Sequence, residues 1–527
     1  MTEANIDNIN LLLNSGKFES ALNLINQLLS SKLAYEDQIR IKILKARYYV
    51  KQGQFQNSLD IAEPSLKEIN SVSYNKLMID ILLLISEAYW RIGKAKDSRK
   101  AIERAEELIK EYKEDDILFQ KGNIEHNKAS IYLHEGKLDD AINYFSEALT
   151  LRNQISNNLY GIGETLNSLG VTYYYKGQLV KALDYYKESL NVKQKLGNKQ
   201  QIAIALNNIG DVYHTQGELN LAWNYYNQSL DLFEEIGNNE HIFSGLHNLG
   251  KVFYQKGEFN TALEYFDKAL KVGEIIDNKI SLSENLFHQI GVAIEKKDKE
   301  LIEKYANYLK SISETTDNKI IKQRNLVSQA LILKNKNQRR DKIKAQEILQ
   351  SILLDEIVNH ELRVSALLHL CELLLYELRL TMDPEEEKYY FEEIKKLSGI
   401  LLKTAQDQQL HSLLSETYLL QSRLAIMEFD IQKSLQLITT ANMIAEERGL
   451  KKLAQTISIE MDLLSSQLID WKVILKQKPQ IKSLSELIQI SDLVNRMIKK
   501  RVYKNQQELK DYILDAKKLI ETWDASV

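Results

Sequence analysis

The sequence has few of the residues that build disulfide-linked or loop-rich proteins. Its 527 residues include one cysteine, Cys371, and three prolines. A single cysteine excludes an intramolecular disulfide and favours a reducing compartment. Scarce proline, together with 44% apolar and 27% charged residues, is typical of a helix-rich soluble protein.

Long apolar runs are missing as well. No stretch approaches the roughly 18 uncharged apolar residues that a membrane-spanning helix needs. Met1-Thr-Glu-Ala lacks the basic start and the apolar run of a secretory signal. The net charge is only −4, so no overall field draws the protein to nucleic acid or to an anionic membrane. We expect a cytoplasmic protein without membrane insertion.

Motifs for catalysis and for cofactor binding are also absent. The sequence contains no nucleophile elbow, no HExxH zinc motif and no P-loop. Gly161-Ile-Gly163 begins like a dinucleotide fingerprint, but it follows a predicted helix and lacks the third glycine. We therefore expect a protein that is not an enzyme and that needs no cofactor.

In their place the sequence has a motif of about 40 residues that repeats. Leu206, Ile209 and Gly210 share one face of a predicted first helix, and Ala222 and Tyr226 share one face of a second. The corresponding residues of the next unit are Leu246, Leu249, Gly250, Ala262 and Phe266. Self-similarity of this length is the mark of a helical solenoid.

A glycine between the two helices marks each repeat. Seven of these loop glycines recur every 37 to 43 residues: Gly16, Gly53, Gly93, Gly136, Gly177, Gly217 and Gly257. A small residue stands five positions after each of them: Ala21, Ser58, Ser98, Ala141, Ala182, Ala222 and Ala262. We expect the two helices to approach most closely there. An eighth repeat begins at Phe287, but Lys296-Lys-Asp-Lys299 replaces its glycine turn.

The regularity of the repeats divides the chain into three predicted parts. Residues 1–310 are predicted to form a solenoid of seven or eight repeats, and residues 311–475 to continue it with degenerate helix pairs. Residues 476–527 are predicted to form helices that cap its open end, because a terminal repeat otherwise exposes an apolar face. The alternative is that these helices bind in the groove of the solenoid or to a partner.

The repeat resembles the tetratricopeptide repeat (TPR) family. Leu206, Gly210, Tyr213, Gly217 and Ala222 carry the resemblance in one unit. The family unit has about 34 residues, and the longer unit here is similar to the repeats of kinesin light chains and spindle-orientation adaptors. The resemblance implies an all-α, right-handed superhelix. It also implies an adaptor or scaffold that binds an extended peptide of a protein partner in its concave groove.

In that family the first helices line the groove, which implies a row of polar groove residues here, called the polar ladder below. It consists of His126, Asn127, Asn167, Tyr174, Asn207, Asn208, Asp211, His214, His247, Asn248, Lys251, Tyr254 and His288, with Ser130, Ser168 and Gln289 beside them. An Asn amide donates and accepts, so such a row can pair with an extended peptide backbone. The alternative is that these amides bond to neighbouring helices and stabilise the stack.

Two other kinds of site are disfavoured by the sequence. The ladder histidines raise the possibility of zinc, but successive repeats are expected to hold them roughly 10 Å apart, whereas zinc ligands lie about 2 Å from the metal. Basic clusters at 334–344 and 496–504 lack the interleaved aromatics of a single-strand binder. We therefore expect neither a metal site nor a nucleic-acid partner.

Two alternatives to the adaptor role remain open. One is a regulatory sensor whose groove is occupied by its own C-terminal helices, or by a partner subunit, until a signal displaces them. The other is an assembly scaffold that uses its outer face. The sequence leaves the partner and the oligomeric state open.

Overall fold

The structure is a computed structural model that describes residues 2–69, 75–113, 117–355, 359–381, 383–428 and 430–476. Within these ranges the regular elements are helices and no strand occurs, so the all-α prediction is confirmed. None of the helices found there is apolar over enough of its length to cross a bilayer. The predicted capping helices after Lys476 and the basic cluster at 496–504 lie outside the described residues.

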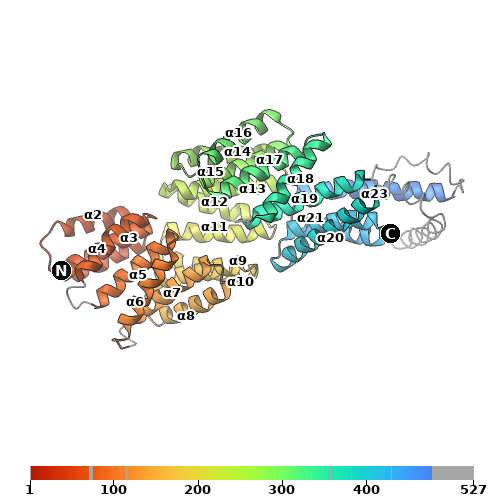
Figure 1. Ribbon diagram of the computed structural model, residues 1–527. Helices are drawn as coiled ribbons and strands as arrows, with labels where there is room; N and C mark the ends of the chain where they lie inside the picture. Colours follow the sequence, from red (N-terminus) through yellow and green to blue (C-terminus); the bar gives the residue numbers. More distant parts are fainter. Residues whose placement is uncertain are drawn as a thin grey trace. The chain divides into compact units, whose positions relative to one another are not determined.

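The described part of the chain forms 23 helices that follow one another through short connections (Figure 1). The first twelve are α1 Thr2–Asn14, α2 Phe18–Leu29, α3 Tyr35–Lys51, α4 Phe55–Ile69, α5 Asn75–Arg91, α6 Ala95–Ile109, α7 Leu118–His134, α8 Leu138–Asn153, α9 Leu159–Tyr175, α10 Leu179–Leu196, α11 Lys199–Thr215 and α12 Leu219–Ile236. The others are α13 Asn239–Gln255, α14 Phe259–Ile276, α15 Lys279–Glu295, α16 Lys299–Glu314, α17 Lys319–Lys334, α18 Arg339–Leu354, α19 His360–Leu380, α20 Pro384–Asp407, α21 His411–Met427, α22 Ile431–Glu447 and α23 Lys451–Lys476.

Each predicted repeat is a pair of helices joined by a tight turn. The seven loop glycines all have φ between 72° and 79°. Glycine adopts this left-handed conformation without the steric cost that a Cβ brings, which explains its recurrence. In the eighth repeat Lys297 occupies the turn with φ 55°. The register read from the loop glycines is therefore confirmed.

Close approach of the two helices holds each pair together. The small residues predicted at the contact, such as Ala141, Ala182 and Ala262, are completely buried. On the facing first helix a Cβ added to Gly250 would lie only 2.6 Å from Cδ1 of Phe266. The aromatic ring of the second helix thus packs directly on the backbone of the first.

First helices of successive repeats also lie side by side. In the N-terminal half α1 contacts α3, which contacts α5, which contacts α7, and α7 contacts α9. The same series continues from α13 through α15, α17 and α19 to α21. The first helices therefore form a layer of their own, so that side chains at one position of the repeat are brought into rows.

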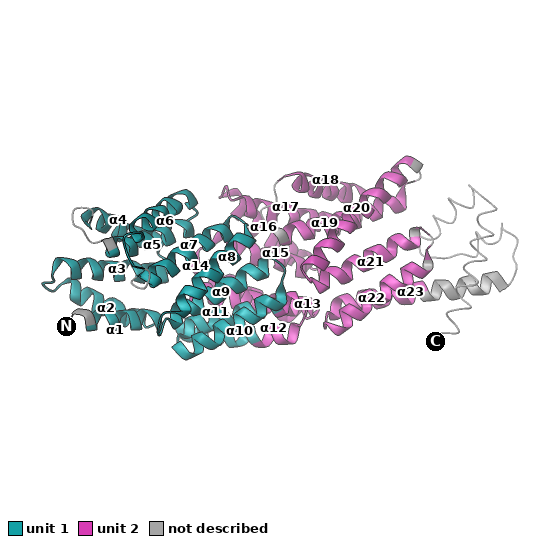
Figure 2. Cartoon of the chain, turned by 90° about the horizontal axis from the view of Figure 1, so that it is seen from below, with its two compact units in different colours: residues 1–212, 225–237 teal, residues 213–224, 238–527 magenta. Residues whose placement is uncertain are grey.

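The chain divides into two compact units (Figure 2). Unit 1 contains residues 1–212 and 225–237, and unit 2 contains residues 213–224 and 238–527. This division rests on compactness, whereas the predicted boundary at residue 310 rests on the regularity of the repeats. The three predicted parts therefore remain a prediction.

Each unit is closed by a contact between segments far apart in sequence. In unit 1 Nδ2 of Asn198 donates to the backbone carbonyl of Asn14 at 2.7 Å. In unit 2 Nη1 of Arg448, which follows α22, lies 2.6 Å from Oε1 of Glu218 at the start of α12. Segments far apart in sequence thus meet within each unit.

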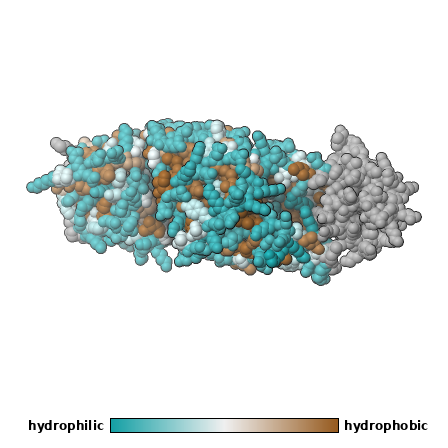
Figure 3. Space-filling model, turned by 90° about the horizontal axis from the view of Figure 1, so that it is seen from above, coloured by the Kyte–Doolittle hydropathy of each residue, from teal (hydrophilic) through white to brown (hydrophobic). Residues whose placement is uncertain are grey.

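Unit 2 contains the degenerate repeats predicted after residue 310. Helices α17 and α18 form one pair in contact, and α21 and α22 form another. Polar side chains cover most of the face seen in Figure 3, and the apolar ones are scattered singly or in small groups. The apolar residues therefore serve mainly the contacts between helices.

We predict that Gly250→Ala destabilises unit 2. The added methyl group would overlap the ring of Phe266, and overpacking of this kind costs about 1–3 kcal/mol. Gly399→Ala is the matched control, because a Cβ at Gly399 in α20 meets nothing within 4 Å. That change should be neutral or stabilising by up to about 1 kcal/mol. Thermal unfolding followed by circular dichroism measures both, and equal melting temperatures would contradict the packing account.

Candidate functional site

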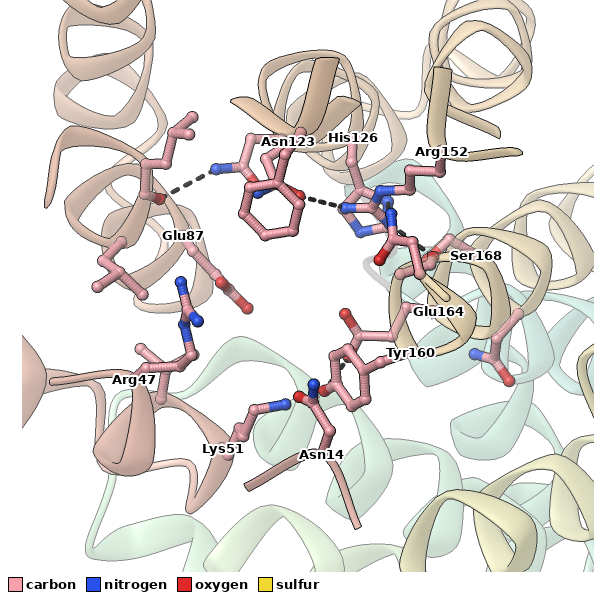
Figure 4. Close-up of a pocket in the computed structure, with 18 of the residues that line it drawn as sticks. Asn14, Arg47, Lys51, Glu87, Asn123, His126, Arg152, Tyr160, Glu164 and Ser168 are labelled. Atoms are coloured by element: carbon pink, nitrogen blue, oxygen red, sulfur yellow. Dashed lines mark hydrogen bonds between the residues drawn. The ribbon is translucent and has the colours of Figure 1, made fainter. Parts of the chain in front are cut away.

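Unit 1 encloses a polar cavity of about 340 Å³ (Figure 4). Its walls come mainly from the first helices α3, α5, α7, α9 and α11, with Arg152 of α8 reaching in beside them. The cavity therefore lies on the layer that the sequence assigned to the groove.

The lining side chains recur at fixed distances from the loop glycine of their repeat. Asp80, Asn123 and Glu164 stand thirteen residues before it, His126 and Asn167 ten, Asn127 and Ser168 nine, and Arg47 and Glu87 six. Apart from the adjacent offsets ten and nine, these offsets differ by three, four or seven residues, so the positions share one broad helix face. The repeat itself thus builds the wall of the cavity.

Acidic and basic side chains point into this cavity from several helices. Arg47 and Lys51 come from α3, Glu87 from α5 and Glu164 from α9 (Figure 4). Within the described residues no ion pair shorter than 4.0 Å joins Glu87 to Arg47 or Lys51. Charges held apart in this way can meet a ligand, although Nη1 of Arg47 also donates to Oδ1 of Asn10 at 3.0 Å.

Burial shifts the pKa values of these charged groups. Burial raises the pKa of Glu87, although the charge of Arg91 lowers it. Burial likewise raises the pKa of Asp80. Burial lowers the pKa of Lys51 to about 8, against the opposing effect of Glu164. The ionised forms are therefore under-solvated, and a ligand of complementary charge would stabilise them.

Lys51 is held at the cavity wall by an aromatic ring. Its Nζ lies 3.3 Å from the centroid of Tyr160, a cation–π contact. The hydroxyl of Tyr160 donates to Oε1 of Glu164 at 2.5 Å. On one side of the cavity, the ammonium of Lys51, the ring of Tyr160 and the carboxylate of Glu164 are therefore in successive contact.

Arg152 orders the opposite side of the cavity. Its guanidinium is buried and donates from Nη1 to the carbonyl of Gly161 at 2.7 Å and from Nη2 to Oδ1 of Asn123 at 2.7 Å. Its Nε is buried without a hydrogen-bond partner. Burial, followed by the charge of Arg152, holds the pKa of His126 well below its usual range, so the imidazole is neutral.

The polar ladder in unit 1 is only partly a lining of this cavity. His126, Asn127 and Asn167 line it. Nδ2 of Asn127 donates to the carbonyl of Leu83 at 3.0 Å. Nδ2 of Asn208 donates to Oδ1 of Asn167 at 3.1 Å. Consecutive first helices therefore bring ladder amides together, as a common surface requires, and these amides also bond to neighbouring helices.

Three other ladder residues of unit 1 do not line the cavity. Nδ2 of Asn207 donates to Oδ2 of Asp211 at 3.2 Å. The hydroxyl of Tyr226 on α12 donates to Oδ1 of the same carboxylate at 2.7 Å. The ring of Tyr174 packs edge-on against Tyr175. These side chains therefore lie elsewhere on the repeat, and a binding role for them remains a prediction.

The ladder residues of unit 2 gather in a second polar cluster. The ring centroids of His247 and His288 are 5.1 Å apart, so the expected separation of about 10 Å is wrong for this pair. His247 lies on α13 and His288 on α15, and their side chains extend toward one another, so the rings are closer together than the axes of packed helices. Burial lowers the pKa of His247 and holds that of His288 well below its usual range.

The remaining ladder residues of unit 2 lie near this cluster or on the same helix. Nζ of Lys251 is 4.0 Å from Oε1 of Glu361. Burial, together with the smaller effect of the charge of Lys251, lowers the pKa of His214 to about 3. Nζ of Lys452 donates to the hydroxyl of Tyr254 at 3.4 Å. Asn248 is partly buried on α13.

The sequence prediction missed the charged half of the cavity in unit 1. The polar ladder begins at His126 and leaves out the first three repeats, which are looser copies of the motif. Yet the position six residues before the loop glycine, which supplied Asp211 and Lys251, gives Arg47 and Glu87 in those repeats. Extending the same register to the N-terminus would have found them. Arg152 belongs to a second helix, and no groove pattern predicts it.

We predict a specific pH dependence of stability from Lys51. Its pKa falls from 10.5 to about 8 on folding, so between these values the unfolded chain binds more protons than the folded one. Stability therefore rises with pH in that window, by about 1 kcal/mol per pH unit for this group. Lys51→Met should remove this part of the slope. The measurement is the difference in unfolding free energy between the two proteins from pH 7 to 10.5, and a difference that does not change with pH would contradict the burial of the ammonium.

A family model described as "MalT-like TPR region" matches residues 122–451. No curated protein matches the sequence. Among solved structures the chain is similar to the apo form of RapI, with 16% identity, a TM-score of 0.46, and coverage of 66% of this chain and 95% of that one.

Two further solved structures are similar over most of their length. One is a Rap protein complexed with competence and sporulation factor, with 15% identity, a TM-score of 0.46, and coverage of 77% of this chain and 99% of that one. The other is the apo form of the quorum sensor NprR from B. thuringiensis, with 18% identity, a TM-score of 0.44, and coverage of 75% and 98%.

Proposed function

Because this chain belongs to the family of MalT-like TPR regions, we propose that it is a non-enzymatic adaptor that binds an extended peptide segment of a partner protein. The proposed site is the cavity of unit 1. The observation that carries the proposal is the set of charged and amide side chains that the repeat register aims into one enclosed space. The interaction itself is a binding event, and no residue is assigned a catalytic role.

The chemistry of the lining indicates what the peptide should carry. Asn127 and Asn167 stand on adjacent positions of the repeat, Asn123 stands one turn before Asn127 on α7, and all three supply amides that can pair with backbone groups. Glu87 suits a basic side chain or an ammonium group, and Arg47 suits a carboxylate. We therefore expect a segment with opposite charges close together. The cavity of about 340 Å³ holds roughly two or three residues, near the lower limit of ligand pockets.

The proposal predicts that Glu87→Gln weakens peptide binding. Peptides selected from a random library against the full chain provide the probe, and fluorescence anisotropy gives their Kd. Loss of a buried charged hydrogen-bond partner costs about 1.5–3 kcal/mol, which corresponds to roughly 10-fold or more in Kd. Asn167→Ala should weaken binding as well. His411→Ala in unit 2 is the control and should leave Kd unchanged. Selected peptides whose Kd is the same for all variants would rule out this cavity as the site.

A second candidate function concerns unit 2, where the chain's own C-terminal part touches the polar ladder. Lys452 in the first turn of α23 contacts Tyr254, and its Nζ lies 2.5 Å from Oε1 of Glu295. Arg448 just before α23 pairs with Glu218. The helices that the sensor alternative places in the groove, residues 476–527, lie outside the described residues; the contacts of Lys452 and Arg448 favour a variant of it in which a ligand or partner competes with α23 for this face.

The sensor alternative predicts that α23 is released when both contacts are removed. In the double variant Arg448→Ala, Lys452→Ala, amide hydrogen exchange at the start of α23 should accelerate by roughly 10-fold or more, while exchange in α13 to α15 should change little. Lys451→Ala is the matched control, because this side chain is exposed. If amide hydrogen exchange in the double variant is unchanged, the sensor alternative is ruled out.

A further inference from the structure

Two imidazoles and a carboxylate converge in unit 2, outside the cavity proposed for peptide binding. His247 comes from α13, and Glu284 and His288 come from one face of α15. One ligand atom from each lies within 4.8 Å of the other two. His247 is 4% exposed and His288 9% exposed, so the group is largely withdrawn from solvent. From this arrangement we propose that unit 2 binds a divalent transition-metal ion, with zinc as the best match.

The hydrogen bonds around His247 prepare it to act as a ligand. Its Nδ1 lies 3.0 Å from Oδ1 of Asn285, and an amide oxygen only accepts, so Nδ1 carries the proton. Nε2 therefore has the free lone pair. It is buried without a hydrogen-bond partner, and 3.7 Å away is Oε1 of Glu284. An imidazole whose second nitrogen is fixed by an oxygen acceptor is the usual arrangement of a metal-bound histidine.

Hydrogen bonds also fix the orientation of the Glu284 carboxylate. Nη2 of Arg324 on α17 holds its Oε2 at 2.7 Å. Nη1 of Arg324 donates to the backbone carbonyl of Ile280 at 2.8 Å, so the guanidinium is itself fixed. The other carboxylate oxygen, Oε1, is the one turned toward His247. The carboxylate is thus oriented by a second residue, with one oxygen left for a ligand.

A fourth potential ligand atom, a carboxylate oxygen, lies beside this triad. Oε1 of Glu361 on α19 is 3.8 Å from Nε2 of His288. Ligand atoms about 2.0–2.1 Å from a tetrahedral zinc are separated by roughly 3.4 Å, so the 3.7 Å and 3.8 Å separations need only a small contraction. Two imidazoles with one or two carboxylates suit zinc, cobalt or nickel and do not suit magnesium or calcium, which prefer oxygen ligands.

Lys251 sets the strength of the site. Its Nζ is 4.0 Å from Oε1 of Glu361, where it competes with a metal ion for the carboxylate and repels the metal charge. Removal of this cation should therefore tighten metal binding. A purely structural cluster of histidines would give no such gain.

The test uses the full chain without an affinity tag, first treated with a chelator, and zinc chloride alone as the probe. Isothermal titration should give one tight zinc per chain, and zinc should raise the melting temperature. Glu284→Gln and His288→Leu should each weaken zinc binding at least 10-fold. Lys251→Met should strengthen it by roughly fivefold, the effect of one nearby charge in a watery environment.

The controls distinguish a specific zinc site from adventitious zinc binding. His411→Ala removes a histidine that does not belong to the triad and should leave the zinc affinity unchanged. If His288→Leu fails to fold, Glu284→Gln and Lys251→Met still decide the question. The proposal is overturned if the chain binds no zinc stoichiometrically, or if Glu284→Gln and Lys251→Met both bind zinc like the unmodified chain. These outcomes do not depend on whether the cavity of unit 1 binds peptide.

Discussion

The structure depends on one contact that recurs in the repeats, in which an aromatic ring of the second helix rests on a glycine of the first. Tyr186 lies against Gly170 in this way, and Phe266 lies against Gly250. A side chain at the glycine would push the ring away, so the contact fixes both the distance and the rotation of the two helices. Once the rotation is fixed, the remaining face of every first helix points to the same side, and chemistry placed there is shared between neighbours.

This arrangement explains why polar groups can be enclosed in an otherwise conventional helical stack. In unit 1 the enclosed positions carry charges held apart, such as Glu87 and Lys51, together with amides that are partly used within the stack. In unit 2 the corresponding layer is more fully paired, because Arg324 binds Glu284 and Lys334 binds Glu372. Charges that do not pair with one another can bind a ligand with complementary groups. Paired charges instead stabilise the unit, and only particular atoms, such as Nε2 of His247, are buried without a hydrogen-bond partner.

Closure of each unit adds a second constraint. Asn198 binds the carbonyl of Asn14, and Arg448 binds Glu218, so residues about 184 and 230 positions apart meet. These contacts are few and partly exposed, and such polar contacts are individually weak. The turns of the solenoid are therefore held mainly by neighbour-to-neighbour packing, and the closing contacts are suited to change when a ligand or partner binds.

The helix pairs, the left-handed loop glycines and the buried small residues could be predicted from the sequence, because they follow from local spacing and from the conformational freedom of glycine. The sequence also indicated that His126 and Asn167 share one surface, since equal positions in a repeat face the same way. It could not indicate that Arg152 of a second helix reaches the cavity, or that the rings of His247 and His288 come within 5.1 Å of one another. These contacts are seen only in the tertiary structure. They depend on how side chains of neighbouring helices pack against one another, and the spacing of residues along the chain does not encode that packing.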